Sequence, residues 1–200
     1  IVTGIGQLCT LHSPELDDHE GAGPRRRAEM SELGVFTEAA LAVGDGQVLA
    51  CGPELEVLTG LFGGPDIPDD VEVVDAKGRA VIPGFVDPHT HAVFGRTRQD
   101  EYERRIRGET YLEIAAAGGG IHASVADLRQ RSEAELVDLT VGRLREMLAH
   151  GTTTVEIKSG YGLTLEAELK RLHVAAAAAE VVGIRTVRTC LAAPEVPAEF

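Results

Sequence analysis

Apolar residues in the first part of the chain occur in short runs separated by turn-forming residues, a pattern typical of β-strands. Residues 35–41 and 47–50 flank a Gly-Asp-Gly turn of the kind that joins two antiparallel strands. A third apolar run covers residues 71–74. The stretch 15–27 is polar, contains glycine and proline, and predicts an exposed loop. Residues 1–79 are therefore expected to form a small β unit.

After residue 79 the pattern changes to apolar runs that alternate with helical segments. Residues 80–86 predict a buried strand. Thr110 is a candidate N-cap for a helix through residue 117, which three consecutive glycines then stop. Ser132 and Glu135 have the spacing of a capping box, and the following helix presents one apolar stripe. The stripe consists of Leu136, Leu139, Leu144, Met147 and Leu148.

Two further strands are predicted on either side of a second amphipathic helix. Residues 152–157 are rich in β-branched side chains, and residues 184–192 form the next apolar run. The helix between them carries Leu165, Leu169, Leu172 and Ala176 on one face. Strands separated by helices pair in parallel. A closed eight-unit barrel uses about 250 residues, so this part of the chain has room for fewer than about four strand–helix units.

Composition and charge restrict the classes of partner. The chain has 19 Lys+Arg against 32 Asp+Glu and a net charge of -13, which argues against binding nucleic acid or an anionic membrane. It contains no apolar run of the roughly 18 residues that cross a membrane and no visible secretory signal. Its three cysteines are widely spaced, without a C-x-x-C pair. We expect a cytoplasmic protein with a small-molecule substrate.

A pair of histidines is the first candidate for chemistry. His89 and His91 come directly after the predicted strand 80–86, and residues two apart on an extended chain point to the same side. Both imidazoles could then reach one metal ion. Such a pair arises by chance in roughly one sequence in four of this histidine content, so two turn histidines are the alternative. A position at the carboxyl end of a parallel strand favours ligand binding.

The sequence around this pair resembles a known family. Residues 81–91 read V-I-P-G-F-V-D-P-H-T-H, similar to the P-G-x-x-D-x-H-x-H of the first metal-binding strand in the amidohydrolase superfamily. Residues 91–98 (H-A-V-F-G-R-T-R), 114–121 (I-A-A-A-G-G-G-I) and 152–163 (T-T-T-V-E-I-K-S-G-Y-G-L) resemble the imidazolonepropionase family, in the same order. The preceding β-hairpin resembles the start of that family's small β domain. The resemblance covers nearly the whole chain.

The resemblance implies an α/β fold in two parts. Residues 1–79 would be the N-terminal part of a small β-sandwich domain. Residues 80–200 would supply the first three strands, with their helices, of a (β/α)8 metal-dependent hydrolase barrel that is incomplete in this chain. The implied reaction is hydrolysis of the cyclic amide 4-imidazolone-5-propanoate to N-formimidoyl-L-glutamate in histidine degradation. A homodimer is expected.

The resemblance also implies roles for four residues. His89 and His91 would be two ligands of one divalent metal, zinc or iron, since imidazole suits both. Arg98 and Tyr161 would contact the substrate. A guanidinium can bind the propionate through two parallel hydrogen bonds, and a phenol can bond the ring while its face packs on it. From the residues alone, Arg98 could instead be a solvated charge among Arg96, Arg104 and Arg105.

Other candidates are assigned no catalytic role. A bridging lysine of binuclear amidohydrolases lies on the fourth barrel strand, whereas Lys158 follows the second predicted strand, so a structural role is expected. The glycines at 118–120 follow a helix, and no Lys-Ser/Thr pair comes after them, which excludes a phosphate loop and favours a loop at the pocket edge. The remaining histidines are expected at surface, cap or helix-face positions: His12, His19, His122, His150 and His173.

Two departures from the family pattern matter for function. Pro194 stands where the family has a substrate-contacting histidine, and losing one polar contact costs about 1–3 kcal/mol. Two histidines also fall short of the three protein ligands of a catalytic zinc. The other ligands and the catalytic acid–base groups are expected beyond Phe200, so this chain alone should be inactive. The alternatives are another amidohydrolase (a deaminase or cyclic amidase) with an altered substrate, and a non-catalytic fragment or pseudoenzyme.

Overall fold

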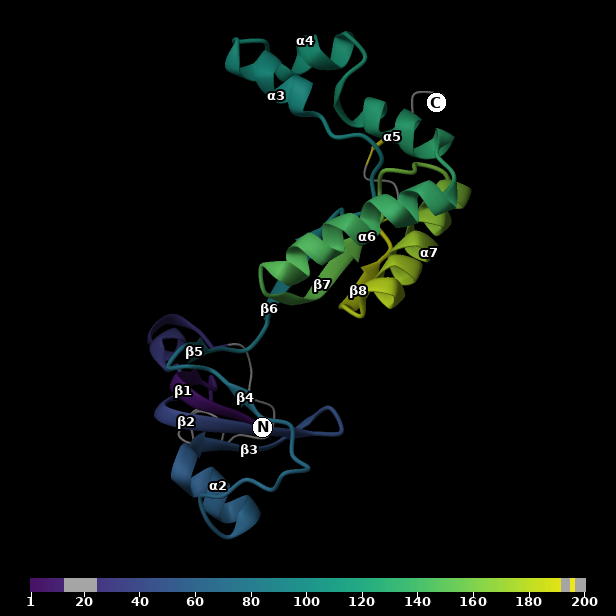
Figure 1. Ribbon diagram of the computed structural model, residues 1–200. Helices are drawn as coiled ribbons and strands as arrows, with labels where there is room; N and C mark the ends of the chain where they lie inside the picture. Colours follow the sequence, from purple (N-terminus) through teal and green to yellow (C-terminus); the bar gives the residue numbers. More distant parts are fainter. Residues whose placement is uncertain (13–24, 192–194, 197–200) are drawn as a thin grey trace. The chain divides into compact units, whose positions relative to one another are not determined.

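The chain combines α-helices and β-strands in two compact units, Ile1–Pro83 and Gly84–Phe200 (Figure 1). The computed structural model describes residues 1–12, 25–191 and 195–196. Each unit has its own sheet and its own buried core. No helix among these residues is long and apolar enough to cross a membrane.

The first unit is built on a five-stranded sheet in the order β3-β2-β1-β4, in which β5 also pairs with β1. Its strands are β1 (Val2–Cys9), β2 (Val35–Gly44), β3 (Gln47–Pro53), β4 (Val74–Asp75) and β5 (Ala80–Val81). The predicted antiparallel hairpin is confirmed as β2–β3. Its turn places Asp45 and Gly46 at φ 50° and 74°, the left-handed region that glycine adopts most easily.

Several predictions for this unit were incomplete or wrong. Helix α2 (Glu54–Phe62) and the short 3-10 helix η1 (Arg27–Ser31) were not predicted. The run at 71–74 contributes only Val74 to a strand. This strand, β4, consists of Val74 and Asp75, which pair with β1. Most of the predicted loop 15–27 lies outside the described residues, and its last residue begins η1.

The predicted strand 80–86 is wrong as a single element. Ala80 and Val81 form β5 and pair with β1, whereas Phe85 begins β6 (Phe85–Thr90) in the sheet of the second unit. Pro83 lies between them and has no N–H to donate to a ladder, which ends the first pairing. His89 consequently lies inside β6 instead of after a strand, and only His91 follows it.

The second unit contains the predicted parallel sheet, in the order β6-β7-β8. Helix α6 (Glu133–Ala149) leads to β7 (Thr152–Lys158), and helix α7 (Leu165–Val182) leads to β8 (Arg185–Thr189). The two helices lie side by side against the sheet (Figure 1). The buried core of this unit includes Leu128, Leu136, Leu144, Val155, Ile157, Val174 and Ile184. The apolar face predicted for α7 is wrong, because Leu165 and Leu169 are exposed and the helix buries the face that carries Ala167, Val174 and Ala178.

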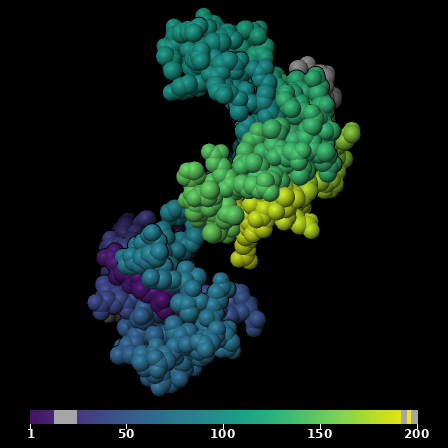
Figure 2. All heavy atoms as spheres, viewed as in Figure 1, coloured from purple at the N-terminus to yellow at the C-terminus, as the bar shows by residue number. Residues whose placement is uncertain are grey.

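Three shorter helices connect β6 to α6. They are α3 (Gln99–Ile106), α4 (Tyr111–Ala116) and α5 (Gly120–Gln130). The helix capped by Thr110 is confirmed as α4, and the side chains of α3 and α4 form a small lobe of their own (Figure 2). The glycine triplet stops α4 as predicted, but its assignment as a loop is wrong for Gly120, which begins α5 with Gly119 as its N-cap. Gly118 and Gly120 have φ of 84° and 73°, which lets the chain reverse between the helices.

The capping box of α6 gives a test of local stability. The Ser132 hydroxyl accepts the Glu135 N–H at 3.2 Å, and the Glu135 carboxylate accepts the Ser132 N–H at 2.9 Å. Replacing Ser132 by alanine should lower the free energy of unfolding by about 1 kcal/mol, because the Glu135 N–H loses its acceptor. Urea denaturation would measure this loss. Ser132→Thr retains the hydroxyl and is the control; equal losses in both variants would contradict the assignment.

Candidate active site

The two candidate histidines lie close together at the carboxyl end of β6. Their ring centroids are 5.8 Å apart at an interplanar angle of 72°. His89 is exposed, whereas His91 is partly buried, and its Nδ1 is buried with no hydrogen-bond partner among the described residues. Burial and the positive charge of Arg171 lower the pKa of His91, which favours the neutral imidazole. Neutral imidazole is the form that ligates metals.

Tyr161 lies directly against His91. The two rings are stacked, with centroids 4.5 Å apart and planes 11° from parallel. Tyr161 is in the segment Ser159–Leu163, hereafter the tyrosine loop, which joins β7 to α7. Parallel pairing of β6 with β7 puts the ends of both strands at one edge of the sheet, so residues 70 positions apart in sequence become neighbours.

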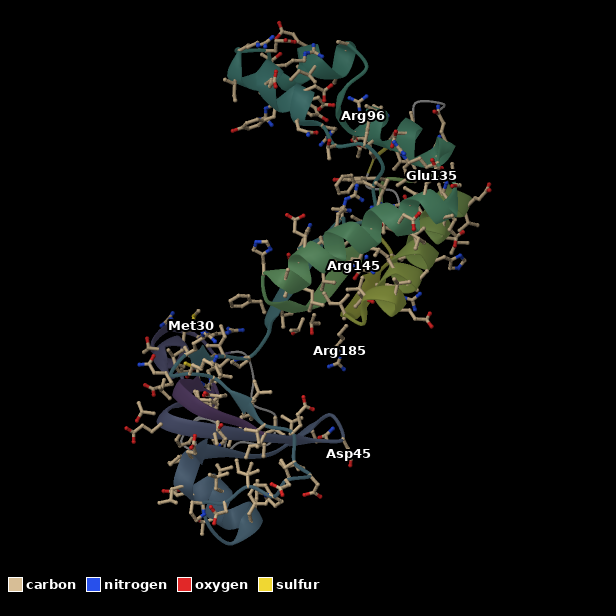
Figure 3. The ribbon with its side chains drawn as sticks, viewed as in Figure 1. Met30, Asp45, Arg96, Glu135, Arg145 and Arg185 are labelled. Carbon is tan, nitrogen blue, oxygen red and sulfur yellow. The ribbon has the colours of Figure 1, made fainter. Side chains whose placement is uncertain are left out.

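A cavity of about 290 Å³ brings three of the four candidate residues together. Its lining consists of His91, Phe94, Arg96, Thr97, Arg98, Ser124 and Tyr161. The Arg98 side chain is 39% exposed and its guanidinium is 3.7 Å from the Glu101 carboxylate, so it is neither buried nor tightly paired. Arg96 lies beside α5, where its N–H donates to Asp127 (Figure 3). The lining thus includes two arginines, one histidine and one tyrosine, and the Arg96 guanidinium pairs with the Asp100 carboxylate at 2.9 Å.

Sequence reasoning missed part of this lining. Ser124 belongs to α5, a helix that was not predicted. Phe94 and Thr97 stand in the string 91–98, but no role was assigned to them. A larger cavity of about 620 Å³ lies in the first unit, but its lining has no histidine or arginine and includes none of the candidate residues.

The histidine pair suits a divalent metal as a partial ligand set. The unpartnered Nδ1 of His91 and the neutral state of its ring are what a metal ligand requires. Within the described parts of the chain, no group of three or more His, Cys, Asp and Glu side chains could hold a metal ion. His89 and His91 can therefore contribute two ligands, and a complete site needs others.

Two further residues singled out in the sequence are Lys158, which the structure describes, and Pro194, which it does not. Lys158 is the last residue of β7, the second strand of the sheet, and its ammonium group pairs with the Glu156 carboxylate at 2.5 Å. This ion pair fits the structural role expected from its strand. Pro194 lies outside the described residues. Among the other histidines, His150 caps the C-terminus of α6 and His173 is exposed on α7, while His19 is also outside the described residues.

Comparisons with known proteins show which proteins this chain is similar to. Residues 72–122 match the amidohydrolase family. The imidazolonepropionase of Symbiobacterium thermophilum is 46% identical over 200 residues, which are all of this chain and 44% of that protein. The imidazolonepropionase of Geobacillus kaustophilus is 41% identical over 97% of this chain and 44% of its own length. Over its whole length the chain is thus similar to one part of the imidazolonepropionases. It spans less than half the length of these curated imidazolonepropionases.

Solved structures extend the likeness to the fold. A zinc complex of atrazine chlorohydrolase from Arthrobacter aurescens TC1 matches 94% of this chain and 35% of its own, with a TM-score of 0.53 and 16% identity. A triazine hydrolase variant matches 94% of this chain and 34% of its own, with a TM-score of 0.53 and 17% identity. At these identities the likeness concerns the mixed α/β fold alone and says nothing about the substrate.

Proposed function

We propose that the protein hydrolyses 4-imidazolone-5-propanoate to N-formimidoyl-L-glutamate in histidine degradation, and that this chain supplies the N-terminal part of the enzyme. One water is consumed, and one C–N bond of the ring opens. The observation that carries the proposal is the cavity that joins His91, Arg98 and Tyr161, in a chain that is 46% identical to an imidazolonepropionase over its whole length.

In the proposed mechanism each of the four candidate residues has one task. His89 and His91 hold a divalent metal, zinc or iron, which when bound lowers the pKa of a water and polarises the ring carbonyl. Arg98 binds the propionate through its guanidinium, and Tyr161 orients the ring, with its own ring fixed by the stack on His91. Two histidines do not complete a catalytic metal site, so the mechanism also needs further metal ligands and proton-transferring groups.

We also propose the finer architecture of the family for the two units. The sheet β6-β7-β8 would be the first three strands of a (β/α)8 barrel, and the first unit would be the start of a small β-sandwich domain. Parallel pairing, helical connections and candidate residues at the carboxyl ends of strands support this assignment. A homodimer, a cytoplasmic location and the absence of nucleic-acid or membrane partners stay predictions.

Pro194 supports a second candidate function. Because proline offers no side-chain donor or acceptor at a position where the family has a histidine, the substrate could be another cyclic amide or an amine removed by deamination. A non-catalytic relative that keeps the fold is the remaining alternative.

Assay of the full-length protein with 4-imidazolone-5-propanoate, with metal content measured on the same sample, tests these alternatives. Turnover with about one metal per protomer is expected. Bound metal without turnover would mean that the substrate is a different cyclic amide or amine. A folded protein with no bound metal and no turnover would favour the non-catalytic relative.

Replacing Arg98 by alanine in the full-length protein should raise KM for the propionate substrate by about 10- to 150-fold, because a hydrogen bond to a charged group contributes about 1.5–3 kcal/mol. The change in kcat should be within about threefold if the contact is equal in ground and transition states. Arg107→Ala is the matched control, since Arg107 is 75% exposed and does not line the cavity. Steady-state kinetics would measure both; an unchanged KM would return Arg98 to the role of a solvated charge.

A further inference from the structure

The first two turns of α7 carry a buried acid and a buried base that together bind both loops of the cavity. Glu168 and Arg171 are three residues apart, their side chains are 10% and 1% exposed, and their nearest charged atoms are 4.0 Å apart. Buried charges are costly unless they are paired and hydrogen-bonded. The hydrogen bonds of both side chains run to residues of the two loops.

We propose that Glu168 and Arg171 are positioning residues, which fix Tyr161 and His91 for the reaction proposed above, on which this inference rests. Each residue binds one loop: Glu168 the tyrosine loop, and Arg171 the segment of residues 91–95, hereafter the histidine loop.

Glu168 organises the tyrosine loop around its carboxylate. Its oxygens accept the N–H groups of Gly160, Gly162 and Leu163, the last two at 2.7 and 2.8 Å. Burial raises the pKa of Glu168, but these backbone hydrogen bonds outweigh it and lower the pKa, so the carboxylate stays ionised. Leu163 has φ 57°, a conformation that costs a non-glycine residue about 1–3 kcal/mol and persists only when surrounding contacts impose it.

The loop also approaches α7 too closely for a side chain at one point. A Cβ on Gly162 would lie 2.7 Å from backbone atoms of Ala167 and Glu168. The tyrosine loop is therefore folded tightly onto the start of α7, and Tyr161, between two residues whose N–H groups bind the carboxylate, has little freedom to move.

Arg171 makes the matching contacts with the histidine loop. Its Nε and one terminal nitrogen donate to the Val93 carbonyl at 3.2 and 2.9 Å, and its guanidinium carbon is 5.1 Å from the centre of the Tyr161 ring. Arg143 of α6 supports the same loop by donating to the carbonyls of Ala92, Phe94 and Gly95. The stacked rings of His91 and Tyr161 thus belong to two loops that are fixed to one helix.

Residue-resolved amide exchange on the full-length protein tests this arrangement without needing activity. In the unmodified protein the amides of Gly160, Gly162 and Leu163 should exchange as slowly as those of β7, and fast exchange at these three positions would overturn the proposal. Glu168→Gln keeps the shape of the side chain and replaces one acceptor by a donor. These amides should then exchange at least about tenfold faster, with β7 unchanged.

Activity gives the second readout. Glu168→Gln should lower kcat by about tenfold or more with metal content unchanged, whereas the matched control Glu166→Gln, an exposed glutamate of the same helical turn, should change neither. Because Glu168 acts through Tyr161, adding Glu168→Gln to Tyr161→Ala should cost little more than Tyr161→Ala alone.

The outcomes separate this inference from the proposed function. Losses that multiply in the double variant would overturn the positioning role and leave a purely structural ion pair. If the full-length protein does not act on 4-imidazolone-5-propanoate, the proposed function fails. The exchange experiment remains decisive for the anchoring of the tyrosine loop by Glu168. Faster amide exchange at 160–163 in Glu168→Gln would support this anchoring, and unchanged exchange would overturn it.

Discussion

Replacing His91 by alanine in the full-length protein is expected to remove the metal and abolish hydrolysis. His91 supplies a buried nitrogen that has no hydrogen-bond partner in the described part of the chain, on a ring whose neutral form is favoured. A catalytic metal held by few protein ligands does not tolerate the loss of one. We expect metal content to fall from about one per protomer to near zero, and kcat to fall on the order of a thousandfold or more. Elemental analysis and steady-state assays on the same sample would measure both.

A second histidine provides the control for this experiment. His173 is exposed on α7, and alanine is well tolerated in a helix, so His173→Ala should keep both metal and activity. His89→Ala should resemble His91→Ala, although His89 is more exposed. Full metal occupancy in the His91 variant would reject the ligand role and leave the stack on Tyr161 as the only function of this ring.

The parts of the fold that could be predicted are those with a strong periodic pattern. The segments around 110–117, 132–149 and 152–157 have caps, apolar stripes or β-branched runs, and each forms the predicted element. Helix α3 could not be predicted in this way because its sequence, Q-D-E-Y-E-R-R-I, has only Tyr102 and Ile106 as large apolar residues, and both are exposed.

The other errors come from tertiary context. The apolar run 80–86 has the composition of one strand, but its two ends pair with different sheets. Helix α2 contains Leu55, Val57 and Leu58 in a region of strands, where a short apolar run does not distinguish the two structures. Only the partners that each segment meets in the folded chain decide these cases.

The candidate site was predictable to the extent that it resembles a family motif. His89, His91, Arg98 and Tyr161 stand in matching strings, and three of them line one cavity. Ser124, Glu168 and Arg171 stand in no such string, and their roles depend on contacts across long stretches of chain. The hydrogen bond from Arg171 to Val93 spans 78 positions, which no local pattern indicates.

The burial of Arg171 sets up the largest expected change in stability. It is among the largest side chains that are fully buried, and burial lowers its pKa to about 10, so the guanidinium remains charged at neutral pH. Its charge faces Glu168, and two of its nitrogens donate to the Val93 carbonyl. Removing one member of a buried ion pair leaves the other charge without compensation.

Arg171→Met preserves much of the side-chain volume and removes the charge, so it should lower the free energy of unfolding by about 3–5 kcal/mol. Arg145→Ala is the control, because Arg145 is exposed on α6 (Figure 3) and its loss should change stability by less than about 0.5 kcal/mol. Denaturant unfolding of the full-length variants would measure both.

The double variant Glu168→Gln with Arg171→Met should recover part of the loss, since no unpaired charge then remains buried. If Arg171→Met is as stable as Arg145→Ala, the three loop amides alone are enough to stabilise the Glu168 carboxylate.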